Sequence, residues 1–229
     1  MYRLWVILLV VAIAIPSMAV ERKRLSEVDQ EAFNEQSRVM MAASYNEVGA
    51  AWLIPQELWK LHLLNRPLAA PQIMKIVSPY FILGVAQVDM SPFNSGSFYP
   101  EDSLTMNLTV AYRDSSGAEF VMESVIVPDA DFQSVLDILR PTMQKKLGYL
   151  SNGIHFLVFP DVDESGERIV DPYIPGALEF WMETRSGKEM YGEIELPMDA
   201  LFVPRICPNG KPAHVSWKYC PWTGEKLPE

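Results

Sequence analysis

Short polar turns divide the second half of the chain into strand-like segments, and they limit its topology more than any other feature. Residues 113–117, 163–166 and 184–187 each combine Asp, Ser or Thr with a final glycine, which is typical of hairpin turns. Strands joined by tight turns run antiparallel, because a parallel pair needs a long crossover. We therefore expect an α+β fold with an antiparallel sheet rather than a parallel α/β fold.

The strands themselves follow from hydrophobic periodicity. Residues 80–90 form an apolar run, and residues 104–112 alternate strictly, with Leu104 and Tyr112 at the two ends of one face. Residues 154–159 are apolar apart from His155, which predicts a central strand covered on both faces. Further strands are expected over residues 119–127, 167–171, 178–183 and 190–196.

Helices are predicted before and between these strands. Ser26 and Asp29 begin an amphipathic pattern that extends to about residue 48, and shorter helices are expected over 55–65 and 71–77. A long helix follows Asp129, is expected to kink or break at Pro141, and ends before Gly148. We expect residues 20–78 to form a helical segment that packs on a sheet domain of residues 79–203, with the long helix across one face of the sheet.

The first 19 residues have the organisation of a signal peptide. A basic Arg3 precedes an uncharged run over residues 4–15, and Ser17 and Ala19 are the small residues of a cleavage site. We expect cleavage after Ala19 and a periplasmic or secreted protein. The alternative is an uncleaved anchor over residues 4–20 with a cytoplasmic domain, because basic residues follow at 22–24. Membrane contact is expected only in that alternative.

The charge of the chain excludes one class of partner. It carries 29 acidic against 19 basic residues, a formal charge of -10, whereas nucleic-acid surfaces need clustered Lys and Arg. A chain of 229 residues can also bury a large core without cysteine cross-links.

The tail, residues 204–229, has a different composition from the rest. Cys207-Pro208-Asn209-Gly210 and Tyr219-Cys220-Pro221-Trp222-Thr223-Gly224 resemble the two knuckles of a zinc ribbon, over about residues 205–227. The second ligand of each knuckle would fall on Gly210 and Thr223, which leaves two thiols. A structural zinc ion needs four ligands, and His214 in a short loop is more typical of a surface residue. We expect neither a metal nor another cofactor.

The same resemblance implies a disulfide. The first cysteines of the two knuckles meet at one metal in a zinc ribbon, which would bring Cys207 and Cys220 together. In an oxidising compartment they would then form a bond that stabilises the tail by about 3 kcal/mol. This expectation agrees with secretion.

Motifs for catalysis are lacking, and we therefore expect a protein without catalytic activity. No nucleophile elbow, P-loop, dinucleotide fingerprint or zinc-protease motif occurs. The alternative is a hydrolase that uses His155 or a carboxylate, with candidates at Asp89, Glu101, Asp102, Asp129 and Asp131. Residues 161–166 resemble the first half of a calcium loop, but Arg168 and Pro172 disagree with the second half, so a solvated turn is expected. The methionines are expected in the core rather than at copper.

Two aromatic groups are candidates for a partner surface. The loop over residues 89–102 holds Phe93, Phe98 and Tyr99, and the tail holds Trp217 and Trp222. The loop either binds a partner or closes over the core. We expect a secreted or periplasmic accessory or binding protein whose partner is an unidentified protein.

Overall fold

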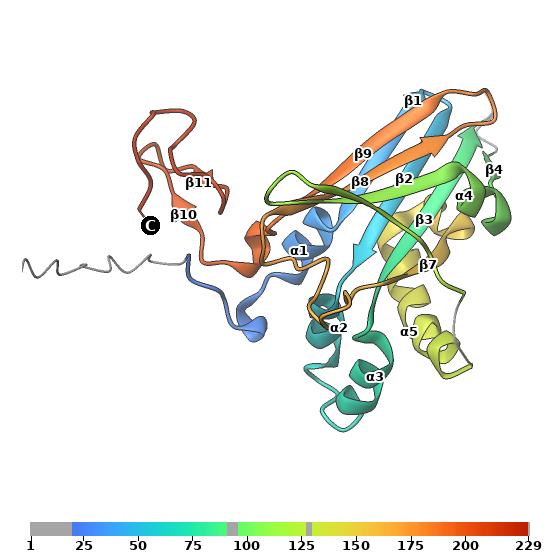
Figure 1. The fold of residues 1–229 in the computed structure, drawn as a ribbon, viewed down its shortest axis with the longest axis horizontal. Coiled ribbons are helices and arrows are strands. Elements are labelled where there is room, and N and C mark those ends of the chain that lie inside the picture. Colours follow the sequence, from blue (N-terminus) through green and yellow to red (C-terminus); the bar gives the residue numbers. More distant parts are fainter. Residues whose placement is uncertain (1–19, 91–95, 127–129, 229) are drawn as a thin grey trace, which may run out of the picture.

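The protein has the α+β fold that the polar turns predict. The computed structural model describes residues 20–90, 96–126 and 130–228. Every strand pair in these ranges is antiparallel, and helices accompany two stacked sheets (Figure 1). The polar turns predict one sheet, whereas the described residues form two large sheets and a small ribbon in the tail.

The first sheet has five strands, and its longest strand lies at the centre. β3 (Tyr80–Met90) pairs with β2 (Glu47–Ile54) on one side, and with β7 (His155–Pro160) and β4 (Gly96–Phe98) on the other. β1 (Arg38–Ser44) pairs with the free side of β2. Both β2 and β3 are buried along most of their length, which explains their continuous apolar sequence.

The second sheet has four strands in the order β6-β5-β8-β9. The predicted turns at 113–117 and 184–187 join neighbouring strands, and Gly117 and Gly187 adopt the positive φ angles that these turns require. The strands are β5 (Leu108–Asp114), β6 (Glu119–Met122), β8 (Gly176–Glu183) and β9 (Glu189–Leu196).

The two sheets approach closely where glycines face methionines. A Cβ atom at Gly49 of β2 would lie 2.9 Å from Sδ of Met182, and one at Gly192 of β9 would lie 2.7 Å from Cγ of Met41. Met41, Met182 and Met190 are all buried. Flexible thioether side chains thus fill the space between the sheets, the core role expected for methionine.

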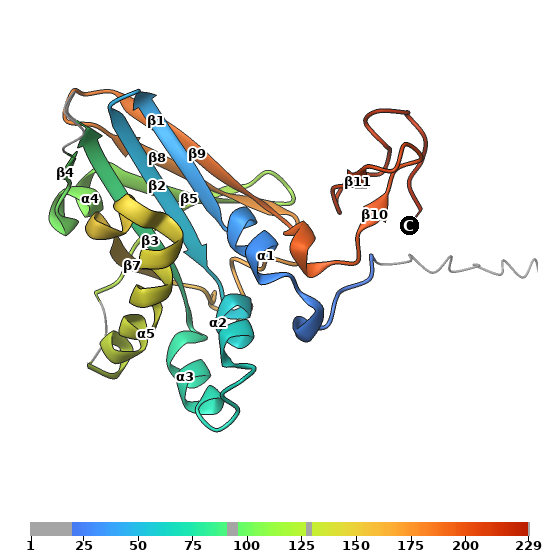
Figure 2. The ribbon, with the colours of Figure 1, turned by 180° about the vertical axis from the view of Figure 1, so that it is seen from behind.

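The long helix α5 (Ala130–Leu147) covers the face of the five-stranded sheet that points away from the second sheet (Figure 2). Its Phe132 packs edge-on against Tyr80, with ring centroids 5.5 Å apart. The helix runs through Pro141 without ending, and Gly148 follows with a positive φ. The shorter helices are η1 (Leu25–Glu27), α1 (Gln30–Gln36), α2 (Gln56–Leu63), α3 (Ala70–Val77), α4 (Glu101–Asn107), η2 (Gly148–Gly153) and η3 (Asp199–Leu201).

The helix predicted over residues 26–48 is wrong beyond its first turns. Asp29 caps α1 as expected, by accepting hydrogen bonds from the backbone N–H groups of Glu31 and Ala32. The chain then turns at Ser37 and forms the β1–β2 hairpin. Residues 47–54 form a strand because they pair with β3. A strand that is buried on both faces lacks the alternation of polar and apolar residues by which a strand is distinguished from a helix in the sequence. Residues 20–78 therefore supply two strands of the first sheet.

Three strand predictions also change. Residues 101–107 form helix α4 rather than the start of a strand, since Pro100 precedes two acidic residues in the first turn. β7 is buried on both faces, but it forms a ladder with β3 alone and meets Val125 in a single bridge. Residues 167–171 contribute only the bridge between Val162 and Arg168.

The expected signal peptide and its cleavage site lie outside the described residues. Among the helices that the structure describes, none combines the length and apolar character needed to cross a bilayer.

Candidate functional site

The tail begins with a small ribbon that carries the first cysteine turn. β10 (Arg205–Ile206) pairs with β11 (Pro212–Ala213). In the turn between them, the N–H of Gly210 donates to the carbonyl of Cys207, and the N–H of Cys207 donates to the carbonyl of Lys211, both at 2.8 Å. Gly210 has a φ of +81°, a conformation that other residues rarely adopt.

The second cysteine turn repeats this arrangement. The N–H of Gly224 donates to the carbonyl of Cys220, and the N–H of Cys220 donates to the carbonyl of Glu225, again at 2.8 Å. Gly224 also has a positive φ. The two turns enclose a second, small core of Cys207, Ala213, Cys220 and Leu227. The two cysteine turns thus share one backbone hydrogen-bond pattern and pack against each other.

Both cysteines are free thiols in the structure, so the predicted disulfide is not formed there. Their side chains share a hydrogen bond. Burial and the neighbouring Cys220 raise the pKa of Cys207 to about 11. Burial also acts to raise the pKa of Cys220, but hydrogen bonds from Cys207, from the Thr223 hydroxyl and from the backbone N–H groups of Trp222 and Thr223 lower it to about 7. Near neutral pH Cys207 is therefore protonated, whereas Cys220 is about half ionised.

No third metal ligand joins the two thiols among the described residues. His214 lies 3.7 Å from the Asp199 carboxylate through Nε2 and contacts the Ser216 hydroxyl through Nδ1 at 2.7 Å. Across the described residues, no group of three or more His, Cys, Asp or Glu side chains could hold a metal ion.

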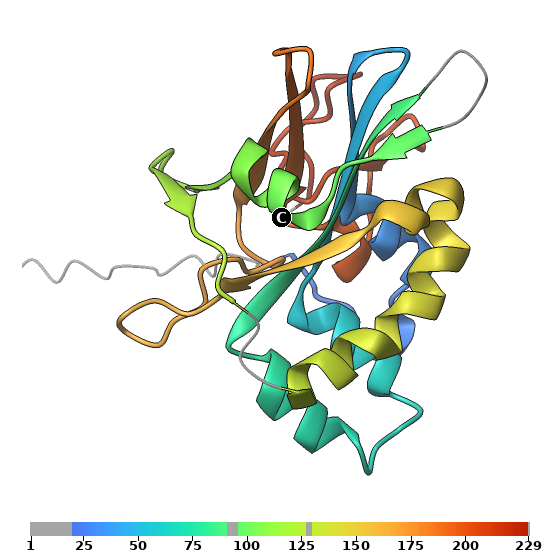
Figure 3. The same cartoon turned by 90° about the vertical axis from the view of Figure 1, so that its right-hand side faces the viewer.

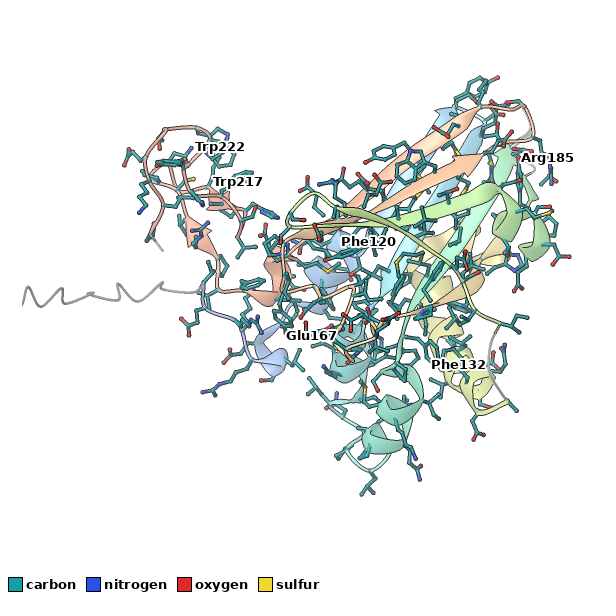
Figure 4. The ribbon with its side chains drawn as sticks, viewed as in Figure 1. Phe120, Phe132, Glu167, Arg185, Trp217 and Trp222 are labelled. Atoms are coloured by element: carbon teal, nitrogen blue, oxygen red, sulfur yellow. The ribbon has the colours of Figure 1, made fainter. Side chains whose placement is uncertain are left out.

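The outer side of the tail carries a cluster of exposed aromatic residues. Trp217 and Trp222 meet at 5.9 Å between ring centroids, and the Lys211 ammonium lies 4.9 Å from the Trp222 ring. The two indoles are 38% and 49% exposed. We call Lys211, Trp217 and Trp222 the aromatic tip. The tail projects from the sheets, and both labelled indoles lie on it (Figure 4).

The aromatic loop residues are not part of this tip. Tyr99 is 1% exposed; its hydroxyl donates to Asp89 and accepts from the N–H of Arg185. Phe98 is half-buried against Gly153, where an added Cβ atom would lie 2.0 Å from the Phe98 ring. Phe93 lies outside the described residues. The described part of this loop packs onto the body of the protein, so it is not a free aromatic surface.

His155 lies beside one of the candidate carboxylates. Its Nδ1 is 3.4 Å from Oε2 of Glu101, and both side chains are partly exposed. Asp89 instead pairs with Arg185 at 3.1 Å, and Asp102 and Asp131 lie exposed in first turns of helices. Asp129 lies outside the described residues. The structure thus brings together one histidine and one carboxylate, without a nucleophile in contact with either among the described hydrogen bonds.

The acidic turn over residues 161–166 is a hairpin tip. The Asp163 carboxylate accepts hydrogen bonds from the backbone N–H groups of Ser165 and Glu167, and Gly166 has a φ of +82°. Asp161 is buried and binds Arg168, which faces away from the turn. Turn formation therefore accounts for the oxygens that resemble a calcium loop.

Sequence reasoning missed a cleft at the end of the second sheet. It has a volume of about 670 Å³, and its lining comes from the β5–β6 hairpin and from the loop over residues 160–174. Figure 3 shows these two segments on the same side of the molecule, β6 in yellow-green and the loop in orange. Its lining combines Tyr112, Phe120, Val121, Met122, Pro160, Ile169 and Ile174 with Asp114, Glu123, Asp163, Arg168 and Asp171. Three separate parts of the chain meet here, and the one local signal is the consecutive exposed pair Phe120 and Val121.

Comparison of the chain with protein-family models, with curated proteins and with solved structures gave no match.

Proposed function

We propose that the protein is a non-catalytic accessory or binding protein that contacts a protein partner through its aromatic tip. The observation that carries this proposal is the edge-to-face pair of exposed tryptophans, Trp217 and Trp222, on a projecting tail. Tryptophan is enriched among residues that dominate binding energy, because it buries a large rigid surface and offers a polar N–H group.

The backbone beneath the tip is well fixed, which favours binding. The Arg205 guanidinium donates to the carbonyl groups of His214, Val215 and Trp217, and the N–H of Val215 donates to the Asp199 carboxylate at 2.7 Å. A surface that is ordered before binding loses less conformational entropy when the partner arrives. The tip is therefore suited to recognition.

Photo-crosslinking in cells of the source organism tests this proposal. A photoreactive phenylalanine analogue at position 222 is expected to give one discrete crosslinked product, which disappears when Trp217→Ala and Lys211→Ala are added. Position 45 is the matched control, because Tyr45 is highly exposed in the β1–β2 turn. Equal products from positions 222 and 45, or none from position 222, would contradict a partner at the tip.

We also propose that the protein is secreted or periplasmic and that Cys207 and Cys220 become a disulfide there. The adjacency of the two buried thiols supports this step. The thiols would lose two electrons and two protons to a disulfide-bearing oxidant of that compartment. Amino-terminal sequencing of the mature protein tests the location: Val20 is expected, and an intact Met1 would support the anchored alternative. Non-reducing mass spectrometry should find the two cysteine peptides linked.

A hydrolase is the second candidate, and the contact between His155 and Glu101 favours it. A carboxylate beside an imidazole can orient it as a general base. Hydrolysis of ester or peptide probes that is lost in His155→Gln would support this candidate over a binding role.

A further inference from the structure

The cleft beside β6 exposes apolar side chains that the fold leaves uncovered. Tyr112, Phe120 and Met122 lie on the same face of the β5–β6 hairpin as the core residue Val110. Towards β6 this face extends past the cover of the first sheet, so Phe120 is half exposed while Val110 is buried. Ile169 and Ile174 form the opposite wall. An apolar cleft of this size at the surface is typical of a binding site.

The outer edge of β6 is free for strand pairing. In the described part of the chain, β6 pairs with β5 alone. The N–H of Asp114 donates to the carbonyl of Ala118, which makes these two a hydrogen-bonded pair. Hydrogen-bonded pairs alternate along an antiparallel ladder, so Phe120 and Met122 direct their backbone groups to β5. Val121 between them directs its N–H and carbonyl groups outwards.

The rim of the cleft is negatively charged. It holds four carboxylates, from Asp114, Glu123, Asp163 and Asp171. Hydrogen bonds within their own turns lower the pKa of Asp114 and Asp163, which keeps both ionised. Arg168 is the one basic side chain among the described lining residues. Its guanidinium is bound to Glu57 and Asp161 and lies 4.0 Å from Asp171, so of the four carboxylates it offsets the charge of Asp171 alone. The rim therefore attracts cations.

We propose that this cleft binds an extended segment of a partner protein in which basic and apolar residues alternate, and that the segment adds as a strand to β6. Backbone hydrogen bonds to Val121 would provide the pairing, and alternate apolar side chains would enter the cleft beside Phe120. The basic residues would lie on the other face of the added strand, from which their long side chains would reach the negatively charged rim. The aromatic tip belongs to a separate part of the chain, although Asp114 at one end of the rim and Trp217 of the tip line a shared hollow.

Binding of a labelled peptide to the full chain tests the proposal. The probe is fluorescein-labelled Lys-Val-Lys-Val-Lys-Val-Lys, followed by fluorescence polarisation at low and high salt. We expect saturable binding that weakens as salt rises, and no binding of the matched Glu-Val-Glu-Val-Glu-Val-Glu peptide. A copy of the basic probe with alternate backbone nitrogens methylated should also fail, because it lacks the donors of one strand edge.

Substitution of Val121 separates strand addition from simple apolar contact. Val121→Pro removes the outward N–H without removing a hydrogen bond to β5, and edge strands tolerate proline at such positions. We expect Val121→Pro to bind the basic probe about tenfold more weakly, which corresponds to the loss of about one backbone hydrogen bond. The control Val121→Thr should bind the probe with unchanged affinity. Asp171→Asn with Glu123→Gln should reduce both the affinity and its salt dependence.

Four results would overturn the proposal. Unchanged binding to Val121→Pro would overturn strand addition, and equal binding of the acidic probe would overturn the charge argument. Absence of binding by the basic probe would overturn the site itself. A wild-type dimer in light scattering that becomes a monomer in Val121→Pro would identify a second copy of this chain as the occupant and would also overturn the proposal. Trp222→Ala should leave probe binding unchanged, because Trp222 lines neither the cleft nor the hollow beside Asp114, and this separates the result from any failure of the aromatic tip.

Discussion

Arg168 donates two parallel hydrogen bonds to the Glu57 carboxylate, at 2.8 and 2.9 Å, although 111 positions separate the two residues in the chain. The same guanidinium binds Asp161 through Nε at 3.0 Å. Glu57 is 3% exposed and Asp161 is 0% exposed. This network ties the loop over residues 160–174, one wall of the cleft, to helix α2 of the first half of the chain.

Removal of Arg168 should therefore destabilise the fold strongly. Arg168→Ala leaves the buried Asp161 without its cation and leaves Glu57 with the Lys60 ammonium at 3.4 Å, so we expect a loss of about 3 kcal/mol or more in the free energy of unfolding by urea. Arg168→Lys keeps the charge but not the forked geometry and should lose less. The control is Arg113→Ala, whose more exposed ion pairs with Glu179 and Glu193 should contribute about 1 kcal/mol or less. Equal losses in Arg168→Ala and Arg113→Ala would contradict this account.

Asp161 should make stability depend on pH in an unusual direction. Burial raises its pKa to about 6, although Arg168 and the N–H of Val170 favour the charged form. A carboxyl group whose pKa is higher in the folded state stabilises the protein below its unfolded pKa, and this contribution disappears as pH rises through about 6. Relative to Asp161→Asn, the wild type should lose about 3 kcal/mol between about pH 4 and pH 7.

Glu47 provides a control of opposite sign. Hydrogen bonds from Lys188, Ser186 and Ser44 lower its pKa to about 2. Its contribution is therefore present above the ordinary pKa of 4.5 and is lost as pH falls towards 2. The stability difference between wild type and Glu47→Gln should shrink on acidification, whereas that between wild type and Asp161→Asn should shift in favour of the wild type. Parallel pH dependences of the two differences would be inconsistent with the opposite pKa shifts.

Local chemistry explains which parts of the fold could be predicted. The β5–β6 and β8–β9 turns end in glycines with positive φ, and α2 and α3 have short apolar stripes, so nearby residues identify these elements. The strand β2 has no such signal. Its identity comes from pairing with β3, whose residues lie more than 20 positions away, and from the methionine contacts at Gly49.

The two candidate surfaces also differ in whether residues close in the sequence define them. The aromatic tip was predictable because Cys207, Gly210, Cys220 and Gly224 define two local turns that place their neighbours. The cleft was not, because it requires β6, Tyr112 and the loop over residues 160–174 to meet after folding. No local pattern indicated the buried ion pair of Arg168, because its partner Glu57 lies 111 positions away in the chain.

Gly153 should tolerate no side chain while Phe98 is present. An added Cβ atom would lie 2.0 to 2.7 Å from three Phe98 atoms. We expect Gly153→Ala to lower the free energy of unfolding by about 1 to 3 kcal/mol, the usual cost of overpacking. The double-mutant cycle with Phe98→Ala provides the control. In that background the alanine at position 153 should cost much less, and an additive result would show that the Phe98 ring is not the cause.

Thr223 should control the protonation of Cys220 in the reduced protein. Its hydroxyl is one of the donors that hold the Cys220 pKa at about 7. Thr223→Val removes that donor at nearly constant volume, so the midpoint of thiolate absorbance on pH titration should move from about 7 towards the ordinary 9.0. Cys207→Ala should move it in the same direction, whereas Cys207→Ser keeps a donor and should move it less. The matched control is Thr105→Val on the exposed helix α4, which should leave the midpoint unchanged. A midpoint that stays near 7 in both Thr223→Val and Cys207→Ala would contradict this account, because removal of a donor that stabilises the thiolate must raise the pKa of Cys220.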